Sequence, residues 1–169
     1  MRKFIMIILL LVLVSCAKVD ATLAGMKLIS NNFVTYNLYV PDDWIVTSDD
    51  STGYMGAYVS ESDRSSINVI AFETKEQMTP DEFWEGYKKD LETIFLDIEY
   101  ETVNKILLNG YEANCYEYSA TLTGTAYKFM QVVRLHGGTV YIMTYTAVPE
   151  NYEKNLEDVA KIINRFTFK

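Results

Sequence analysis

The pattern of residues 125–148 constrains the fold of this chain more than any other stretch. Two strand-like segments, 125–135 and 139–148, are joined by a His-Gly-Gly turn. Side chains of both parities in these segments are largely apolar or aromatic, whereas a strand with one face in water alternates apolar and polar residues. We therefore expect an antiparallel sheet that is covered on both faces.

Further strand signals fill most of the chain. Alternating side chains or turn residues mark expected strands at 33–40, 44–47, 53–61, 65–73, 98–108 and 111–122. Asn109-Gly110 separates the last two segments and is a strong signal for a two-residue hairpin, because both central positions of that turn need a positive φ. The order of segments predicts a long antiparallel meander.

Two segments follow the period of a helix instead. Thr79 suits the N-cap, Pro80 suits the first helical position, and Glu82 completes a capping box. Apolar residues then recur at helical spacing, namely Phe83, Tyr87, Leu91, Ile94 and Phe95, with Trp84 widening the stripe. A second helix is expected from about Pro149, with an apolar face of Tyr152, Leu156, Val159, Ile163 and Phe166. We expect an α+β fold, an α/β/α sandwich whose antiparallel sheet has a helix on each face.

The first 16 residues carry the pattern of an export signal. Arg2 and Lys3 precede the apolar run 4–14, which is shorter than the roughly 20 residues that a membrane-spanning helix needs. The sequence Leu13-Val14-Ser15-Cys16 resembles the lipobox of bacterial lipoprotein signal peptides. That resemblance implies cleavage before Cys16 and a lipid on its thiol. An ordinary cleaved signal, or a signal anchor with an incidental cysteine, is the alternative.

These features divide the chain into a signal peptide (1–15), a short tether (16–32) and one globular domain (33–169). Loss of the signal peptide removes two of the 15 basic residues and leaves 13 against 23 acidic ones, a net charge of −10. Such an excess of acid disfavours binding to nucleic acid and electrostatic adhesion to anionic lipid. We expect a monomer that is held at the extracytoplasmic face of the cell membrane by Cys16 alone.

Several short motifs resemble the PsbP-like family. They are the opening strand that ends in "YVPDDW", the "TPDEFW" helix, the glycine Gly110 before "YEANCYEY", and Phe166 and Phe168 in "INRFTF". The resemblance covers 33–169 and implies an α/β/α sandwich around an antiparallel sheet. The family is named for an extrinsic photosystem II subunit and includes a Ran-binding import factor and many small bacterial lipoproteins. Most members of this family act as binding or assembly proteins and not as enzymes, so the resemblance implies a non-enzymatic binding or assembly protein.

Residues that could carry chemistry are few. His136 could serve as a general base or a metal ligand, but an exposed turn residue is the favoured interpretation. Cys115 lies in mid-strand without a neighbouring base, so a buried and inert thiol is favoured over a nucleophile. One histidine and one unmodified cysteine cannot form a zinc site of the usual type. We expect no catalytic, cofactor or metal site, and Cys16 is the single predicted site of modification.

Two groups of acidic residues are candidate sites. Asp42-Asp43 and Asp49-Asp50-Ser51 could hold Ca²⁺ but lack the spacing of an EF-hand loop, so solvated turns are favoured. An enzyme would need a cleft in which carboxylates such as Asp90, Glu92 or Asp97 have perturbed pKa values.

The tyrosines leave two interpretations open. These tyrosines could form a partner-binding surface or line a pocket, although a place in the core of the sheet is favoured. Those on or beside expected strands are Tyr54, Tyr58, Tyr111, Tyr116, Tyr118, Tyr127, Tyr141 and Tyr145. The leading hypothesis is a non-enzymatic binding or assembly module for an envelope protein or complex. The alternative is a carrier of a small molecule or lipid, with a pocket between a helix and the sheet.

Overall fold

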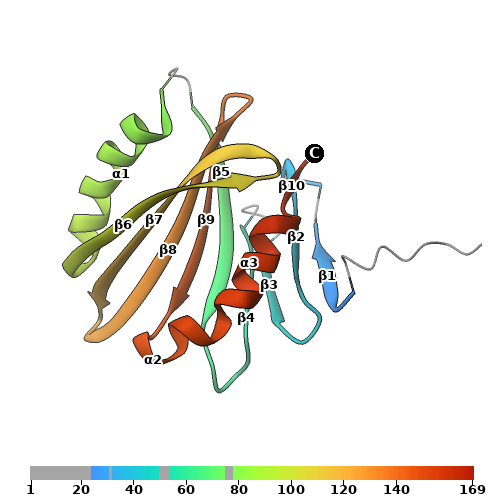
Figure 1. Cartoon of the computed structure of the whole chain (residues 1–169), viewed down its shortest axis with the longest axis horizontal. Helices are drawn as coiled ribbons and strands as arrows, with labels where there is room; N and C mark the ends of the chain where they lie inside the picture. The colour runs from blue at the N-terminus through green and yellow to red at the C-terminus, as the bar shows by residue number, and fades with distance from the viewer. Residues whose placement is uncertain (1–23, 31, 50–53, 75–77) are drawn as a thin grey trace, which may run out of the picture.

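The computed structural model describes residues 24–30, 32–49, 54–74 and 78–169 (Figure 1). These residues form a seven-stranded antiparallel sheet in the order β3-β4-β5-β9-β8-β7-β6 and a three-stranded sheet in the order β1-β2-β10. The expected signal peptide, its lipobox and Cys16 lie outside the described residues.

The large sheet is built from hairpins and a meander. Its strands are β3 (Ile45–Asp49), β4 (Tyr54–Tyr58), β5 (Ser66–Glu73), β6 (Leu96–Leu108), β7 (Tyr111–Leu122), β8 (Thr125–His136) and β9 (Thr139–Ala147). The antiparallel meander β6-β7-β8-β9 was predicted from the sequence and is confirmed. The Asn109-Gly110 turn is also confirmed, with φ values of 50° and 79°.

The small sheet changes the expected boundary of the domain. Its strands are β1 (Met26–Ile29), β2 (Tyr36–Pro41) and β10 (Thr167–Phe168), and both β1 and β10 pair antiparallel with β2. Residues 26–29 had been assigned to the tether 16–32, and that part of the assignment is wrong. Ile29 is buried, and Lys27 donates a hydrogen bond to the carbonyl of Asp42, so β1 belongs to the folded domain.

Helix α1 (Pro80–Ile94) begins as the sequence predicts. The Thr79 hydroxyl accepts a hydrogen bond from the Glu82 amide, and the Glu82 carboxylate accepts one from the Thr79 amide, so the capping box is complete. Trp84 and Leu91 form the buried centre of its apolar face. The sequence also predicts Ile94 on that face, but its side chain is 61% exposed, whereas Phe95 packs on Phe129 of β8.

The C-terminal helix is interrupted where one helix was expected. It consists of α2 (Pro149–Tyr152), a single 3-10 turn (Glu153–Asn155) and α3 (Leu156–Arg165). The apolar side chains Tyr152, Val159 and Ile163 are nevertheless buried, as the spacing predicted. None of the helices in the described ranges has the length and apolar character needed to cross a bilayer.

Side chains on the two faces of the large sheet enter two separate apolar clusters. One cluster joins α1 to one face through residues such as Trp84, Tyr118 and Ile142. The other joins the opposite face to α3 and to the small sheet, through residues such as Val159 and Leu38. Both faces of the central strands are therefore buried, which explains the lack of polar alternation in 125–148.

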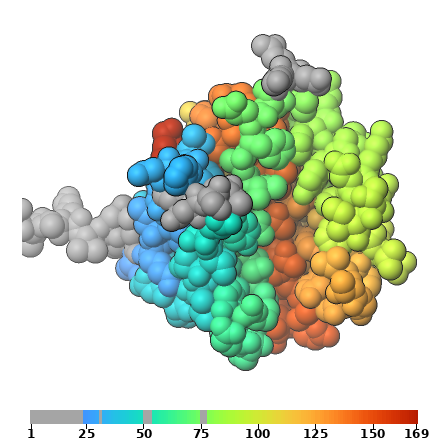
Figure 2. Space-filling view, turned by 180° about the vertical axis from the view of Figure 1, so that it is seen from behind, coloured from blue at the N-terminus to red at the C-terminus, as the bar shows by residue number. Residues whose placement is uncertain are grey.

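The expected sandwich, with helices covering both faces, is not confirmed in that form. On one face the three-stranded sheet shares the cover with α3. On the other, Figure 2 shows α1 on one side only, with a strip of the sheet in the colours of β8 and β9 visible between α1 and β5. The described part of the chain is thus an antiparallel β structure with few helices.

Candidate functional site at the free edge of β6

Strand β6 (Leu96–Leu108) forms one edge of the large sheet, and among the described strands it pairs only with β7. Most of its side chains are exposed, and Val103 and Leu107 are each 63% exposed. An edge strand carries a row of backbone N–H and C=O groups with no neighbouring strand, which another chain can bind.

The two halves of β6 differ in regularity. The pairing with β7 shifts between Leu96 and Glu99 and again between Tyr100 and Thr102, and Asp97 has a positive φ of 52°. Such bulges twist an edge and protect it from pairing with other chains. From Thr102 to Leu108 the register is regular, so this half is the part of the edge that remains open.

The two-residue turn fixes which backbone groups face outward. Leu108 and Tyr111 flank the turn as partners and form a hydrogen-bonded pair of the hairpin. Hydrogen-bonded and non-hydrogen-bonded pairs alternate along an antiparallel ladder. Val103, Lys105 and Leu107 therefore turn their N–H and C=O groups away from β7, toward the free edge.

A cleft of about 260 Å³ lies between this edge and α1. Trp84 and Tyr116 line it with stacked rings, and Tyr100, Thr102 and Val103 supply the strand side. Lys88 lies across the ring of Tyr100, with its Nζ atom 4.3 Å from the ring centroid. The aromatic wall of the cleft thus already accommodates one ammonium group.

Carboxylates surround the same cleft. Asp81 accepts hydrogen bonds from the Asn114 amide at 2.6 Å and from the Tyr116 hydroxyl at 3.3 Å. Burial raises the pKa of Tyr116, and the charges of Asp81 and Glu85 raise it further. In the described part of the chain neither Asp81 nor Glu85 forms a salt bridge. The cleft therefore combines π faces with carboxylates that form no salt bridge, beside the ammonium group of Lys88, and this combination favours a further cation.

A second groove, of about 480 Å³, opens on the opposite face of β6, beneath α3. Its apolar lining includes Ile106, Cys115, Met130 and Ile163. Glu117 also lines the groove, and its carboxylate accepts a hydrogen bond from the Tyr152 hydroxyl at 2.9 Å. Residues 102–108 are thus flanked by an acidic aromatic cleft on one face and a largely apolar groove on the other.

Cys115 lies where the sequence placed it, buried in mid-strand. Burial first, and the nearby Glu117 carboxylate second, raise the pKa of its thiol to about 11. A thiolate is the nucleophilic form, so this environment holds Cys115 in its unreactive state.

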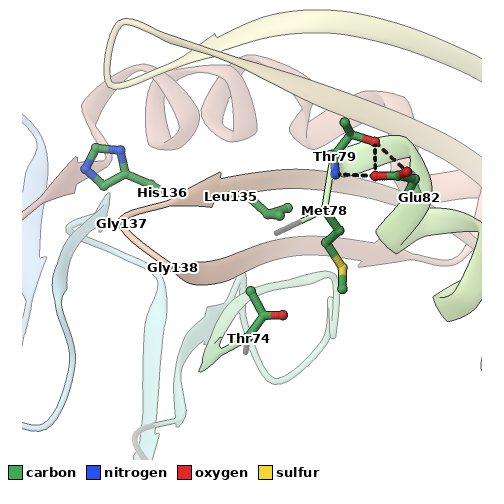
Figure 3. Close-up of a pocket in the computed structure, with 8 residues that line it drawn as sticks. All are labelled: Thr74, Met78, Thr79, Glu82, Leu135, His136, Gly137 and Gly138. Atoms are coloured by element: carbon green, nitrogen blue, oxygen red, sulfur yellow. Dashed lines mark hydrogen bonds between the residues drawn. The ribbon is translucent and has the colours of Figure 1, made fainter. Parts of the chain in front are cut away.

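His136 is not the exposed turn residue that the sequence suggested. It is the last residue of β8, half-buried, with its ring stacked on Phe168 at 4.3 Å and near Tyr111 at 4.8 Å. The glycines that follow it carry the turn, both with positive φ. His136, Thr79 and Glu82 line a cavity of about 390 Å³. In Figure 3 the imidazole points away from Thr79 and Glu82, which are bonded to each other in the capping box.

The acidic residues considered as sites lie apart. Asp42 and Asp43 are exposed in the turn after β2, Asp49 ends β3, and residues 50 and 51 lie outside the described residues. Asp90, Glu92 and Asp97 are exposed and line none of the cavities described above. Among the described residues, no group of three histidine, cysteine, aspartate or glutamate side chains is placed to hold a metal ion.

The tyrosines divide between core and surface. Tyr116, Tyr118, Tyr141 and Tyr145 are buried, so the core interpretation is confirmed for them. Tyr111 is 44% exposed, and Tyr54, Tyr58 and Tyr127 are half-buried.

Sequence reasoning missed the open edge of β6 and both of its flanking grooves. The signal was present in residues 97–105, "DIEYETVNK", where charged side chains interrupt the strand pattern as they do on edge strands.

No protein-family model matches the chain, and no curated protein matches it. Its fold is similar to that of several solved structures, each with a TM-score of 0.61. LpqN of Mycobacterium tuberculosis, involved in cell envelope biogenesis, is 16% identical over 85% of this chain and 90% of its own. The cyanobacterial PsbP protein CyanoP of Synechocystis is 13% identical over 93% and 99%. The Ran-binding protein Mog1p of Saccharomyces cerevisiae is 11% identical over 85% and 95%. These likenesses show the PsbP and Mog1 type of fold.

Proposed function

We propose that this chain is a bacterial lipoprotein, anchored at the extracytoplasmic face of the cell membrane through lipidated Cys16. Its PsbP-like domain acts as a monomeric, non-enzymatic binding or assembly module for an envelope protein or complex. The observation that carries the binding role is the open edge of β6 at 102–108, which lies between two grooves of different chemistry. The anchor is inferred from the lipobox sequence Leu13-Val14-Ser15-Cys16.

The structural neighbours support this proposal by analogy. One is described by its part in cell envelope biogenesis and another by its binding of Ran. A shared fold is a weak argument for a shared function. The proposal therefore rests first on the residues of this chain and only second on the neighbours.

In-cell crosslinking tests the binding role. A photo-crosslinking residue placed at Val103 of the full chain should capture a defined envelope protein, and the same residue at Glu150, which is exposed at the start of α2, should not. If crosslinking residues spread over all exposed elements of the domain capture no defined protein, the binding module is excluded.

The carrier remains a second candidate because of the groove beneath α3. Its volume of about 480 Å³ and its apolar lining are suited to part of an acyl chain. Native mass spectrometry of the chain, purified from its host, should then show a bound lipid that Ala160→Trp expels. A ligand-free mass, together with no binding of a fluorescent fatty acid, would exclude the carrier.

A further inference from the structure

We propose that the partner of this domain adds an extended segment to β6 along residues 102–108, as an extra antiparallel strand. The segment alternates basic and apolar side chains, with the basic ones on the α1 face and the apolar ones on the α3 face. This inference rests on the proposed binding function and specifies the chemistry of the partner.

The backbone of β6 supplies the first part of the recognition. Val103, Lys105 and Leu107 direct their N–H and C=O groups to the free edge, and no bulge interrupts 102–108. An added strand forms main-chain hydrogen bonds with such a row and derives its specificity from pockets for alternate side chains. The bulges at 96–102 limit the segment to the hairpin end of β6.

The α1 face supplies a site for basic side chains. Val103 pairs with Tyr116, whose side chain lies in the α1 cluster, so a residue opposite Val103 projects beside the aromatic cleft. There it meets Asp81 and Glu85, which form no salt bridge in the described part of the chain. Lys88 marks the position that a cation takes on the ring of Tyr100.

Lys105 lies on the same face, and its positive charge would oppose the binding of a basic side chain there. Lys105 projects toward the α1 side, but the carboxylate of Glu112 lies 2.6 Å from its Nζ atom and raises its pKa. Likewise Glu101, at the rim of the cleft, is paired with Lys128 at 2.9 Å. Both pairs are neutral, and Lys105 also interacts with the charge of Asp81. The lining carboxylates that form no salt bridge in the described part of the chain are those of Asp81, Glu85 and Glu117, against the one ammonium group of Lys88.

The α3 face supplies the apolar half of the pattern. Asn104 and Ile106 pair with Cys115 and Ala113, whose side chains lie in the cluster beneath α3. Alternate residues of the added strand therefore project toward the groove that contains Met130 and Ile163. An apolar side chain there buries surface that the domain leaves open to water.

A second copy of this chain is a less suitable occupant. Antiparallel pairing of two β6 strands centred on Lys105 would place Leu107 of the second copy opposite Val103. An apolar side chain would then lie beside a cleft that favours a cation.

Peptide binding tests the inference with the full chain in detergent. The probe is a fluorescent peptide of alternating valine and lysine, compared with valine–glutamate and with clustered-lysine peptides of equal length. We expect the valine–lysine peptide to bind, with an affinity that falls as salt rises.

Glu85→Lys should weaken binding about tenfold, since it reverses a charge at the cleft. The matched control is Asp90→Lys, an exposed acid of α1 that does not line the cleft, and it should change affinity less than about twofold.

Val103→Pro tests the edge itself. The proline removes an N–H that faces the free edge, so the β6–β7 ladder is retained and thermal unfolding should show a folded protein. Binding should nevertheless be lost. Methylation of alternate amides of the peptide should have the same effect and needs no variant.

Three results would overturn the inference. They are equal binding of the lysine and glutamate peptides, equal binding of the clustered-lysine peptide, and binding that is insensitive to both Val103→Pro and amide methylation. A dimer in sedimentation experiments that Val103→Pro dissociates would identify a second copy as the occupant and would also overturn it. A partner crosslinked at another element would leave the proposed function intact, whereas absence of any partner would remove both.

Discussion

Trp84 of α1 lies flat on Tyr116 of β7, with ring centroids 3.8 Å apart and ring planes 6° apart. Both side chains are buried, with 5% and 2% of their surface exposed. This stack joins α1 to the large sheet and places the Asp81 carboxylate within reach of the Tyr116 hydroxyl. The position of the helix, and with it the acidic cleft beside β6, depends on these two rings.

Removal of the indole should therefore destabilise the domain. We expect Trp84→Ala to lower the free energy of unfolding by about 3–5 kcal/mol, the usual cost of truncating a buried aromatic residue. Ile94→Ala, in the exposed last turn of the same helix, should cost less than about 0.5 kcal/mol. Urea denaturation of the two variants and the wild type measures the difference. Similar costs for both would show that the stack does not hold α1 in place.

Two glycines give opposite predictions for the same substitution. A Cβ atom on Gly56 of β4 would lie 2.7 Å from the carbonyl oxygen of Ile67, so Gly56→Ala must displace the backbone of β5 and should lower the melting temperature. A Cβ atom on Gly86 of α1 would meet nothing within 4 Å. Gly86→Ala should instead stabilise the protein by about 0.5–1 kcal/mol, since alanine is the better helix former. Calorimetry of both variants tests the pair, and shifts of equal sign would contradict it.

The capping box of α1 should make stability depend on pH. The Thr79 amide and hydroxyl donate to the Glu82 carboxylate at 2.8 and 3.0 Å and hold its pKa below the usual value. The stabilisation is complete above the unfolded pKa, about 4.3, and is lost as pH falls through the lower folded pKa. Glu82→Gln should thus lower the melting temperature more near neutral pH than in acid. Glu85→Gln removes the same charge outside the cap, and a matching pH dependence in that variant would refute the explanation.

Local chemistry was the part of the fold that could be read from the sequence. Thr79, Pro80 and Glu82 define the start of α1 by contacts within one turn, and Asn109-Gly110 defines the β6–β7 hairpin by its own φ preference. Both features depend on neighbouring residues only, so a linear pattern contains them.

The features that depend on distant contacts were missed. Met26–Ile29 shows little strand pattern, and it becomes β1 because β2 offers it an edge. His136 is half-buried because Phe168, at the far end of the chain, stacks on it. The grooves beside β6 form where α1 and α3 pack across the sheet. A local sequence pattern does not predict how a helix packs on a distant strand.

The thiol of Cys115 should react slowly in the folded protein. Its pKa is raised to about 11, chiefly by burial, so few molecules carry the thiolate at mildly alkaline pH. In a Cys16→Ser chain Cys115 is the only cysteine, and iodoacetamide should modify it many times faster in denaturant than in buffer. Equal rates in the two conditions would mean that the groove beneath α3 admits solvent to the sulfur.

The lipid anchor predicts a change in both location and mass for one substitution. Cys16→Ser removes the thiol that a lipobox donates to the lipid, and the mature chain has a net charge of −10, which anionic lipid repels. No other part of the described domain offers a membrane-spanning helix. We therefore expect wild-type chain in the membrane fraction with an acylated N-terminal residue, and Cys16→Ser chain without the acyl mass and released from the membrane.

The matched control is Cys115→Ser, which removes the other thiol and should leave both the fraction and the acyl mass unchanged. Membrane association of Cys16→Ser with an unaltered N-terminal mass would exclude the lipobox and leave an uncleaved or ordinarily cleaved signal segment as the explanation.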